Sequence, residues 1–121
     1  MVIDDDEDIL ALVKMYLTMN NYAVEALARW ESVDEYIHRF LPELILLDIS
    51  LKGADGRDIC KKLKENADTR HIPVILFSAN SELGSNFKEC QAQGFVEKPF
   101  ELPHLLKTIR FHLDSDHYRN N

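Results

Sequence analysis

The chain has 121 residues, 45% of them hydrophobic and 29% charged, which is the composition of an ordinary globular protein, so we expect one domain (residues 1–121) with one core. Its formal net charge of −7 argues against direct binding to nucleic acid or anionic membranes, because both need a basic surface. No apolar run approaches the roughly 20 residues of a membrane span, and the N-terminus is acidic where a signal peptide would be basic, so we expect a cytoplasmic protein without membrane insertion.

The first half of the chain alternates between short apolar runs and helical patterns. Ser32, with Glu35 three residues later, predicts a capping box at the start of one helix, and Pro42 marks the end of that helix. In chain order, the patterns predict a strand at 1–3, a helix over 9–17, a strand at 22–28, a helix over 33–40 and a strand at 44–47.

The second half continues this alternation after a loop bracketed by Gly53 and Gly56. Cys60 and Cys90 fall in helical patterns without metal-type spacing, and we expect both to be reduced thiols. The predicted elements are a helix around 59–63, a strand at 74–77, a weak helix over 82–93, a strand at 95–97, a helix over 102–113 and a frayed polar tail at 114–121. Five strands alternating with five helices predict an α/β, doubly wound parallel sheet.

Carboxylates follow two of the predicted strands directly. Asp4 and Asp5 come after the first apolar run, and Asp48 comes after Leu44-Ile45-Leu46-Leu47. Because the carboxyl ends of parallel strands meet at one crevice, where such sheets bind ligands, we expect these three side chains in one pocket. Clustered carboxylates repel one another unless a cation lies among them, and a small set of oxygen ligands suits Mg²⁺. The pattern therefore predicts a hard-cation site beside a reactive aspartate.

Four motifs, each at a predicted strand end, give the chain a family resemblance. The spacing is 30 residues from Asp48 to Ser78 and 20 from Ser78 to Lys98. Over nearly its whole length the chain resembles the receiver domains of two-component response regulators, whose flavodoxin-like (chemotaxis-type) fold has the sheet order 2-1-3-4-5. The motifs are Val2-Ile3-Asp4-Asp5-Asp6, Leu46-Leu47-Asp48-Ile49 with Gly53 and Asp55-Gly56, Phe77-Ser78-Ala79, and Lys98-Pro99-Phe100.

The resemblance implies a phospho-accepting domain of a two-component system. Asp48 would take a phosphoryl group from a partner histidine kinase or phosphotransfer protein, with Lys98 and the Ser78 hydroxyl contacting the phosphoryl oxygens. Such a domain is not a conventional enzyme, although it catalyses its own phosphorylation and a slow autodephosphorylation. The implied ligands of Mg²⁺ are Asp5, Asp48, the backbone carbonyl of Ser50 and, through water, Asp4.

The resemblance also implies a conformational switch. Ser78 and Phe95 occupy the two switch positions, and phosphorylation would alter the surface around residues 79–113. We expect a downstream protein, or a second copy of the chain, to bind there through the last two helices. Gly84 and the polar residues of 79–86 disfavour a stable helix, so this segment should exchange amide hydrogens faster than the other helices. The resemblance further implies a cis Lys98–Pro99 peptide bond.

Other function classes fit the sequence less well. A calcium loop starting at Asp4 would need Gly where Ile9 stands and Glu where Met15 stands. A haloacid-dehalogenase-like phosphatase would need a second aspartate where Ser50 follows Asp48, and the four glycines form no phosphate-binding loop. The remaining alternative is a degenerate receiver that acts as an unphosphorylated interaction module.

Two positions depart from the family pattern. Lys52 stands where a proline is frequent, and we expect it to loosen that loop and add a cation at its rim without touching the chemistry. The first strand has three residues before the acidic pair, whereas family members usually begin a few residues earlier. The sequence therefore leaves open whether a segment precedes Met1 and whether an output segment follows Leu113. It also leaves open the cognate kinase and the output.

Overall fold

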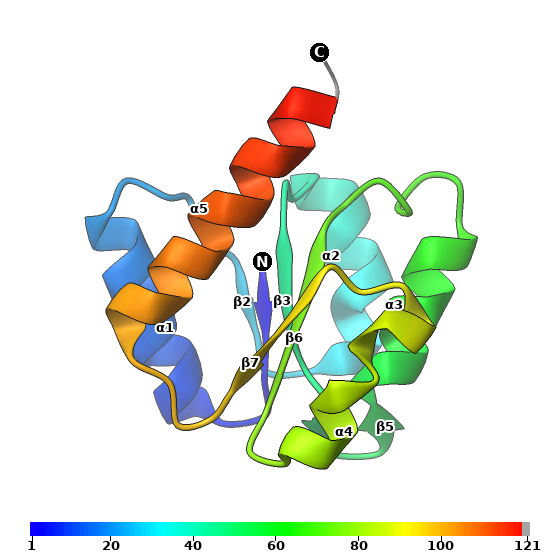
Figure 1. The fold of residues 1–121 in the computed structure, drawn as a ribbon, viewed down its shortest axis with the longest axis horizontal. Helices are drawn as coiled ribbons and strands as arrows, with labels where there is room; N and C mark the ends of the chain where they lie inside the picture. Colours follow the sequence, from blue (N-terminus) through cyan, green and yellow to red (C-terminus); the bar gives the residue numbers. More distant parts are fainter. Residues whose placement is uncertain (120–121) are drawn as a thin grey trace.

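The computed structural model describes the backbone of residues 1–119 and the side chains of residues 1–114. A five-stranded parallel sheet forms its centre, in the order β2-β1-β3-β6-β7 (Figure 1). Counted within this sheet, the order is the expected 2-1-3-4-5, so the doubly wound, flavodoxin-like α/β fold is confirmed. The strands are β1 (Val2–Ile3), β2 (Ala26–Leu27), β3 (Ile45–Asp48), β6 (Val74–Ser78) and β7 (Gly94–Glu97).

Helices cover both faces of the sheet (Figure 1). One face packs against α1 (Glu7–Met19) and α5 (Leu102–Arg119). On the other face lie η1 (Trp30–Ser32), α2 (Val33–Phe40), α3 (Gly56–Glu65), α4 (Ser81–Ser85) and η2 (Phe87–Cys90). Between β3 and α3 the chain forms a small antiparallel hairpin of β4 (Ser50–Leu51) and β5 (Ala54–Asp55). Across the described residues, no helix is long and apolar enough to cross a membrane.

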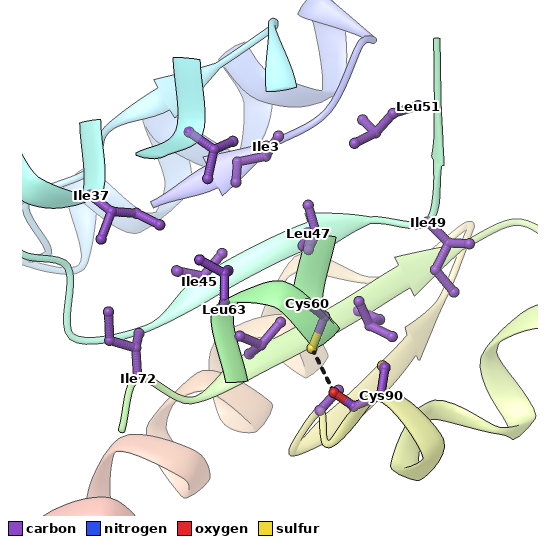
Figure 2. Packing of buried hydrophobic residues seen from close by; sticks show 14 of the residues in the cluster. Ile3, Ile37, Ile45, Leu47, Ile49, Leu51, Cys60, Leu63, Ile72 and Cys90 are labelled. Carbon is purple, nitrogen blue, oxygen red and sulfur yellow. Dashed lines mark hydrogen bonds between the residues drawn. The ribbon is translucent and has the colours of Figure 1, made fainter. Parts of the chain in front are cut away.

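The sheet is buried on both faces, which explains its uninterrupted apolar strands. Within β3, Ile45 and Leu47 contact the α3 side of the core, whereas Leu46 contacts the side of α1 and α5. Figure 2 shows the α3 side, where Cys60 Sγ donates a hydrogen bond of 3.4 Å to the carbonyl oxygen of Cys90. Both cysteines are buried free thiols, as expected, and burial raises the pKa of Cys60 to about 12.

Several element boundaries differ from expectation. The capping box is wrong: the Ser32 side chain makes no capping bond, because its backbone (φ −93°, ψ 2°) is not extended as an N-cap requires. The strand expected at 22–28 pairs only through Ala26 and Leu27, since β1 offers it only Val2 and Ile3. The helix expected over 82–93 is divided at Asn86 into α4 and η2.

Helix α5 extends beyond its expected end at Leu113 and continues to Arg119. The expected frayed tail at 114–121 is therefore helical as far as Arg119, and residues 120–121 lie outside the described part. The physical reason is local, because residues 114–119 contain neither glycine nor proline to end the helix.

Candidate phosphoacceptor site

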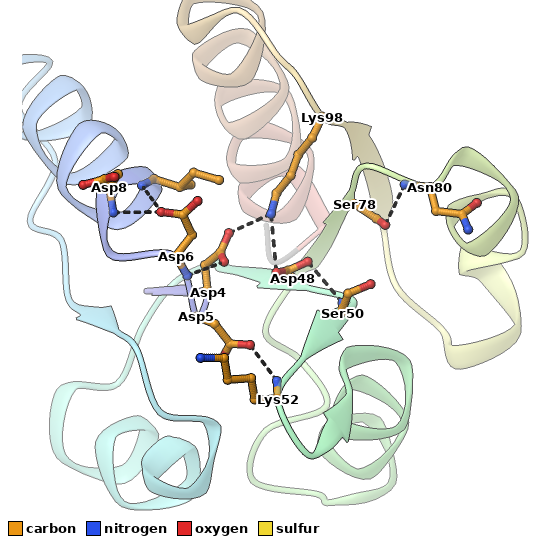
Figure 3. A network of polar contacts seen from close by, with 11 residues as sticks. Asp4, Asp5, Asp6, Asp8, Asp48, Ser50, Lys52, Ser78, Asn80 and Lys98 are labelled. Carbon is orange, nitrogen blue, oxygen red and sulfur yellow. Dashed lines mark hydrogen bonds and ion pairs between the residues drawn. The ribbon is translucent and has the colours of Figure 1, made fainter.

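A cavity of about 420 Å³ opens at the carboxyl end of the sheet. The loops that follow β1, β3, β6 and β7 supply its walls, so segments distant in the sequence converge there (Figure 3). All the residues expected to bind the phosphoryl group or the cation are in its lining, which consists of Asp4, Asp5, Asp6, Asp48, Ser50, Ser78, Ala79, Asn80 and Lys98.

A second cavity, of about 430 Å³, lies at the amino end of β1, β2 and β3. Its walls are mostly apolar and include Leu17, Leu44, Ile109 and Leu113. None of the expected site residues lines it, so the acidic cavity is the candidate site.

Lys98 joins two buried carboxylates at the floor of the acidic cavity. Its Nζ lies 2.8 Å from Asp4 Oδ2 and 3.4 Å from Asp48 Oδ2 (Figure 3). The ammonium also lies 4.7 Å from the ring centroid of Phe77, a cation–π contact. The Lys98–Pro99 bond is cis, as expected. Lys98 therefore neutralises part of the negative charge that the strand ends bring together.

Asp48 ends β3 with only 5% of its surface exposed. Its Oδ1 accepts a hydrogen bond of 3.1 Å from the backbone N–H of Ser50. The pKa of Asp48 is raised to about 6, first by burial and then by the neighbouring Asp4 carboxylate, although Lys98 and the Ser50 amide act in the opposite direction. The charge on Asp48 is thus only partly compensated, which favours the approach of another cation.

Ser78 is buried at the end of β6, on the side of the cavity that leads to α4. Its Oγ accepts a 3.0 Å hydrogen bond from the backbone N–H of Asn80, and its carbonyl accepts a 2.8 Å bond from the backbone N–H of Lys98. The end of β6 and the residue that follows β7 are therefore tied together where the cavity opens.

Phe95 lies on β7 and is not part of the cavity lining. It is half-buried, and its ring occupies the position that a Cβ on Gly84 would take. In the sequence, Gly84 indicates only a low helix propensity. The structure gives a reason for it: any larger residue at this position of α4 would collide with the Phe95 ring.

Asp5 contacts a residue that was expected to stay clear of the chemistry. The backbone N–H of Lys52 donates a 2.6 Å hydrogen bond to Asp5 Oδ2 (Figure 3). The main-chain N–H of Lys52 therefore holds a carboxylate of the cavity, while the expectation for its side chain stays a prediction. A proline, which lacks an N–H, could not make this bond.

The donor set fits Mg²⁺, an ion that proteins usually bind through one or two carboxylates together with water and substrate phosphates. Asp5, Asp48 and Ser50 line one cavity, in which burial and the nearby Asp4 carboxylate raise the pKa of Asp48 and so disfavour its charged form in the absence of a further cation. Among the described residues, no group of three or more His, Cys, Asp or Glu side chains could hold a metal by itself. The expected set has only two directly binding carboxylates, Asp5 and Asp48, and Lys98 contacts the Asp4 carboxylate.

A family model for the response regulator receiver domain matches residues 1–110. The chain belongs to this family. Receiver domains act in two-component signal transduction, where they interact with histidine kinases or phosphotransfer proteins, and they generally bind Mg²⁺ at the phosphorylation site.

Among curated proteins, this receiver domain is similar to response regulator PleD of Caulobacter vibrioides, with 35% identity over 112 residues. It is also similar to the phosphate regulon transcriptional regulatory protein PhoB of Rhizobium meliloti, with 26% identity over 111 residues. These matches cover 91% and 90% of the chain but only 25% of PleD and 49% of PhoB. The chain therefore spans between a quarter and a half of these relatives.

Solved receiver domains share the whole fold. The receiver domain of NtrX from Brucella abortus has a TM-score of 0.84 and 27% identity, covering 93% of this chain and 96% of that one. A CheY-like receiver domain protein from Methanospirillum hungatei has a TM-score of 0.87 and 26% identity, covering 98% and 94%.

Proposed function

We propose that this receiver domain accepts a phosphoryl group on Asp48 from a phosphohistidine of a partner histidine kinase or phosphotransfer protein. The observation that carries the proposal is the position of the Asp48 carboxylate, at the floor of an open cavity with Lys98 Nζ 3.4 Å away. One Asp48 oxygen would form a bond to phosphorus while the phosphorus–nitrogen bond breaks. The departing imidazole keeps the electron pair and takes a proton from solvent, leaving an acyl phosphate.

Lys98 and Ser78 are the groups we assign to the transferred phosphoryl oxygens. Lys98 brings a positive charge to one side of Asp48, and the Ser78 hydroxyl can donate a hydrogen bond from the other, since Ser78 lines the same cavity. Phosphoryl transfer depends mainly on positioning and charge neutralisation, which these two side chains provide.

Asp5, Asp48 and the Ser50 carbonyl are the proposed direct ligands of Mg²⁺, with Asp4 acting through water. When bound, the ion would neutralise charge on the phosphoryl oxygens. Asp4 is suited to the indirect role because its Oδ2 already accepts from Lys98 and its Oδ1 from the Asp6 amide.

The proposed output is a rearrangement around residues 79–113. Ser78 leads directly into α4, and Gly84 of α4 lies against the Phe95 ring of β7, so a shift of the Ser78 hydroxyl toward a phosphoryl group can be transmitted to that ring. A downstream protein or a second copy would bind this surface. Hydrogen exchange over residues 81–90 should be faster than over 56–65 and should slow on phosphorylation; equal, unchanged protection of both segments would contradict this.

The decisive experiment treats the purified protein with a small phosphodonor in Mg²⁺ and measures the intact mass. One phosphoryl group should be added to the wild type and to Asp8→Asn, an exposed acidic control on α1. None should be added to Asp48→Asn. Labelling of Asp48→Asn at the wild-type rate would refute the assignment, and no labelling of the wild type would favour the unphosphorylated interaction module.

The same assay separates the two N-terminal aspartates. Asp5→Ala should abolish Mg²⁺-dependent phosphorylation, because it removes a direct ligand, while Asp4→Ala should retain part of the Mg²⁺ affinity. A titration in which Asp5→Ala binds Mg²⁺ as tightly as the wild type would show that Asp5 is not a ligand.

A further inference from the structure

The backbone of Lys52 connects two side chains from different parts of the chain. Its carbonyl accepts a 2.8 Å hydrogen bond from Trp30 Nε1, and its N–H donates a 2.6 Å bond to Asp5 Oδ2. Trp30 begins η1, far from the cavity lining in sequence, and Asp5 follows β1. The main chain of Lys52 therefore accepts a hydrogen bond from the Trp30 indole and donates one to the Asp5 carboxylate.

The Trp30 indole also packs on the turn that contains Lys52. Nε1 lies 3.9 Å from the position of a Cβ at Gly53, and Gly53 has a φ of +81°, which only glycine adopts readily. The turn joins β4 to β5, a hairpin of two residues per strand that is too short to be stable without support. The indole therefore supplies packing and a hydrogen bond at the point from which the Lys52 amide reaches Asp5.

We propose that Trp30 is a positioning residue of the phosphoacceptor site, acting through the Lys52 backbone to orient Asp5 for the cation. This rests on the proposed function, in which Asp5 is a direct Mg²⁺ ligand. The hydrogen bond from Lys52 engages Oδ2 and would restrict rotation of the carboxylate, so that the ion would meet Asp5 in one orientation. Hydrogen-bonded partners of metal-ligating carboxylates typically change metal affinity 10- to 100-fold.

The test compares the Mg²⁺ affinity of three proteins by calorimetry. Trp30→Phe keeps an aromatic ring but removes the N–H donor, and it should bind Mg²⁺ about ten-fold more weakly than the wild type. Tyr36→Phe on α2 is the matched control, because it also deletes the polar donor of an aromatic residue on this face but leaves the Trp30–Lys52–Asp5 connection intact, and its affinity should stay at the wild-type level. Wild-type affinity in Trp30→Phe would overturn the proposal.

A second variant removes the hydrogen bond from the Lys52 amide to Asp5. Lys52→Pro deletes the N–H that reaches Asp5 and leaves Trp30 in place, so it should weaken Mg²⁺ binding as Trp30→Phe does. If Trp30→Phe does not fold, which circular dichroism would show, Lys52→Pro decides by the same criterion. Retained affinity in Lys52→Pro would contradict the role given to the Lys52 amide.

Two readouts do not depend on phosphorylation. The chain has one tryptophan, so its fluorescence reports on this connection, and emission should change when Mg²⁺ is added to the wild type but not to Asp5→Ala. In Mg²⁺-free protein, the Lys52 amide should exchange several-fold faster in Trp30→Phe than in the wild type. Unchanged exchange of the Lys52 amide would overturn the role proposed for Trp30. Because this measurement needs no phosphorylation, its failure can be told apart from a failure of Asp48 to accept a phosphoryl group.

Discussion

Helices α3 and α4 cover the same face of the sheet and both begin next to the cavity, but they are fastened in different ways. Helix α3 has ten residues and starts at Gly56, whose N–H donates to the Ile49 carbonyl. The Asp55 carboxylate caps it through the Arg57 amide and also forms an ion pair of 2.6 Å with the Arg57 side chain. Buried Cys60 and Leu63 anchor it to the core.

Helix α4 has only five residues, capped by the Asn80 side chain at the Glu82 amide. Its one buried residue is Gly84, and what lies against it is the ring of Phe95. At Gly56, by contrast, the neighbour is the backbone of Asp48. Helix α3 therefore packs on the main chain of Asp48, whereas α4 packs on the side chain of Phe95. We expect the first contact to be rigid and the second to adjust, because a ring can rotate and a buried main chain cannot.

The largest expected effect on stability comes from a substitution at Gly56, where α3 contacts the main chain of Asp48. In Gly56→Ala, the new Cβ would overlap the Asp48 carbonyl and lie 2.9 Å from the Ile49 Cα, and neither backbone atom can move aside. Overpacking of this kind should lower the free energy of unfolding by about 2–3 kcal/mol. Urea denaturation measures it. A loss no larger than that of Gly84→Ala would remove the contrast between the two helices.

A second prediction concerns the free-energy cost of an ionised Asp48 in the folded protein. Its pKa is 3.8 when unfolded and about 6 when folded, so the folded protein binds more protons between these values. Stability should therefore fall as the pH rises from 4 to 6 in Mg²⁺-free buffer, and the ionised carboxylate costs up to about 3 kcal/mol above pH 6.

Asp48→Asn should remove that cost. Without Mg²⁺ at pH 7 the variant should be more stable than the wild type by about 1–3 kcal/mol, and the gain should shrink toward pH 4, where Asp48 is protonated. Thermal or urea unfolding at both pH values measures it. Equal stability of the two proteins at pH 7 would mean that the folded protein does not disfavour the ionised form of Asp48.

Much of this arrangement could be predicted from residues alone. Apolar runs ending in Asp4, Asp48 and Ser78 predicted buried parallel strands and their shared cavity, because burial on both faces leaves a plain signal in the sequence. The order of the strands came from the resemblance, since periodicity carries no information on which strands are neighbours.

Contacts between distant backbone groups could not be predicted in this way. The Lys52 amide bonds to Asp5 across 47 positions, and nothing in a lysine's identity reports where its N–H points. The Gly84–Phe95 contact is similar, since a glycine in a helical pattern indicates only lower helix propensity. The failed capping box at Ser32 shows the same limit, because a backbone conformation set by the preceding 3₁₀ turn overrode a local motif.

The smallest effect on stability, and the sharpest test of the responsive contact, is expected from Gly84→Ala. Alanine should gain about 1 kcal/mol in helix propensity, and displacement of the Phe95 ring should offset it, leaving a net change below about 1 kcal/mol. The ring itself should move, since a Cβ at this position takes its place. Ring proton chemical shifts of Phe95 measure this, with the exposed Ser85→Ala in the same helix as the control. Because the ring can turn while the Asp48 backbone cannot, Gly84→Ala should also change hydrogen exchange over residues 81–90 without altering that over 56–65. Unchanged Phe95 shifts, or a disturbance that spreads equally into α3, would show that α4 is as firmly fixed as its neighbour.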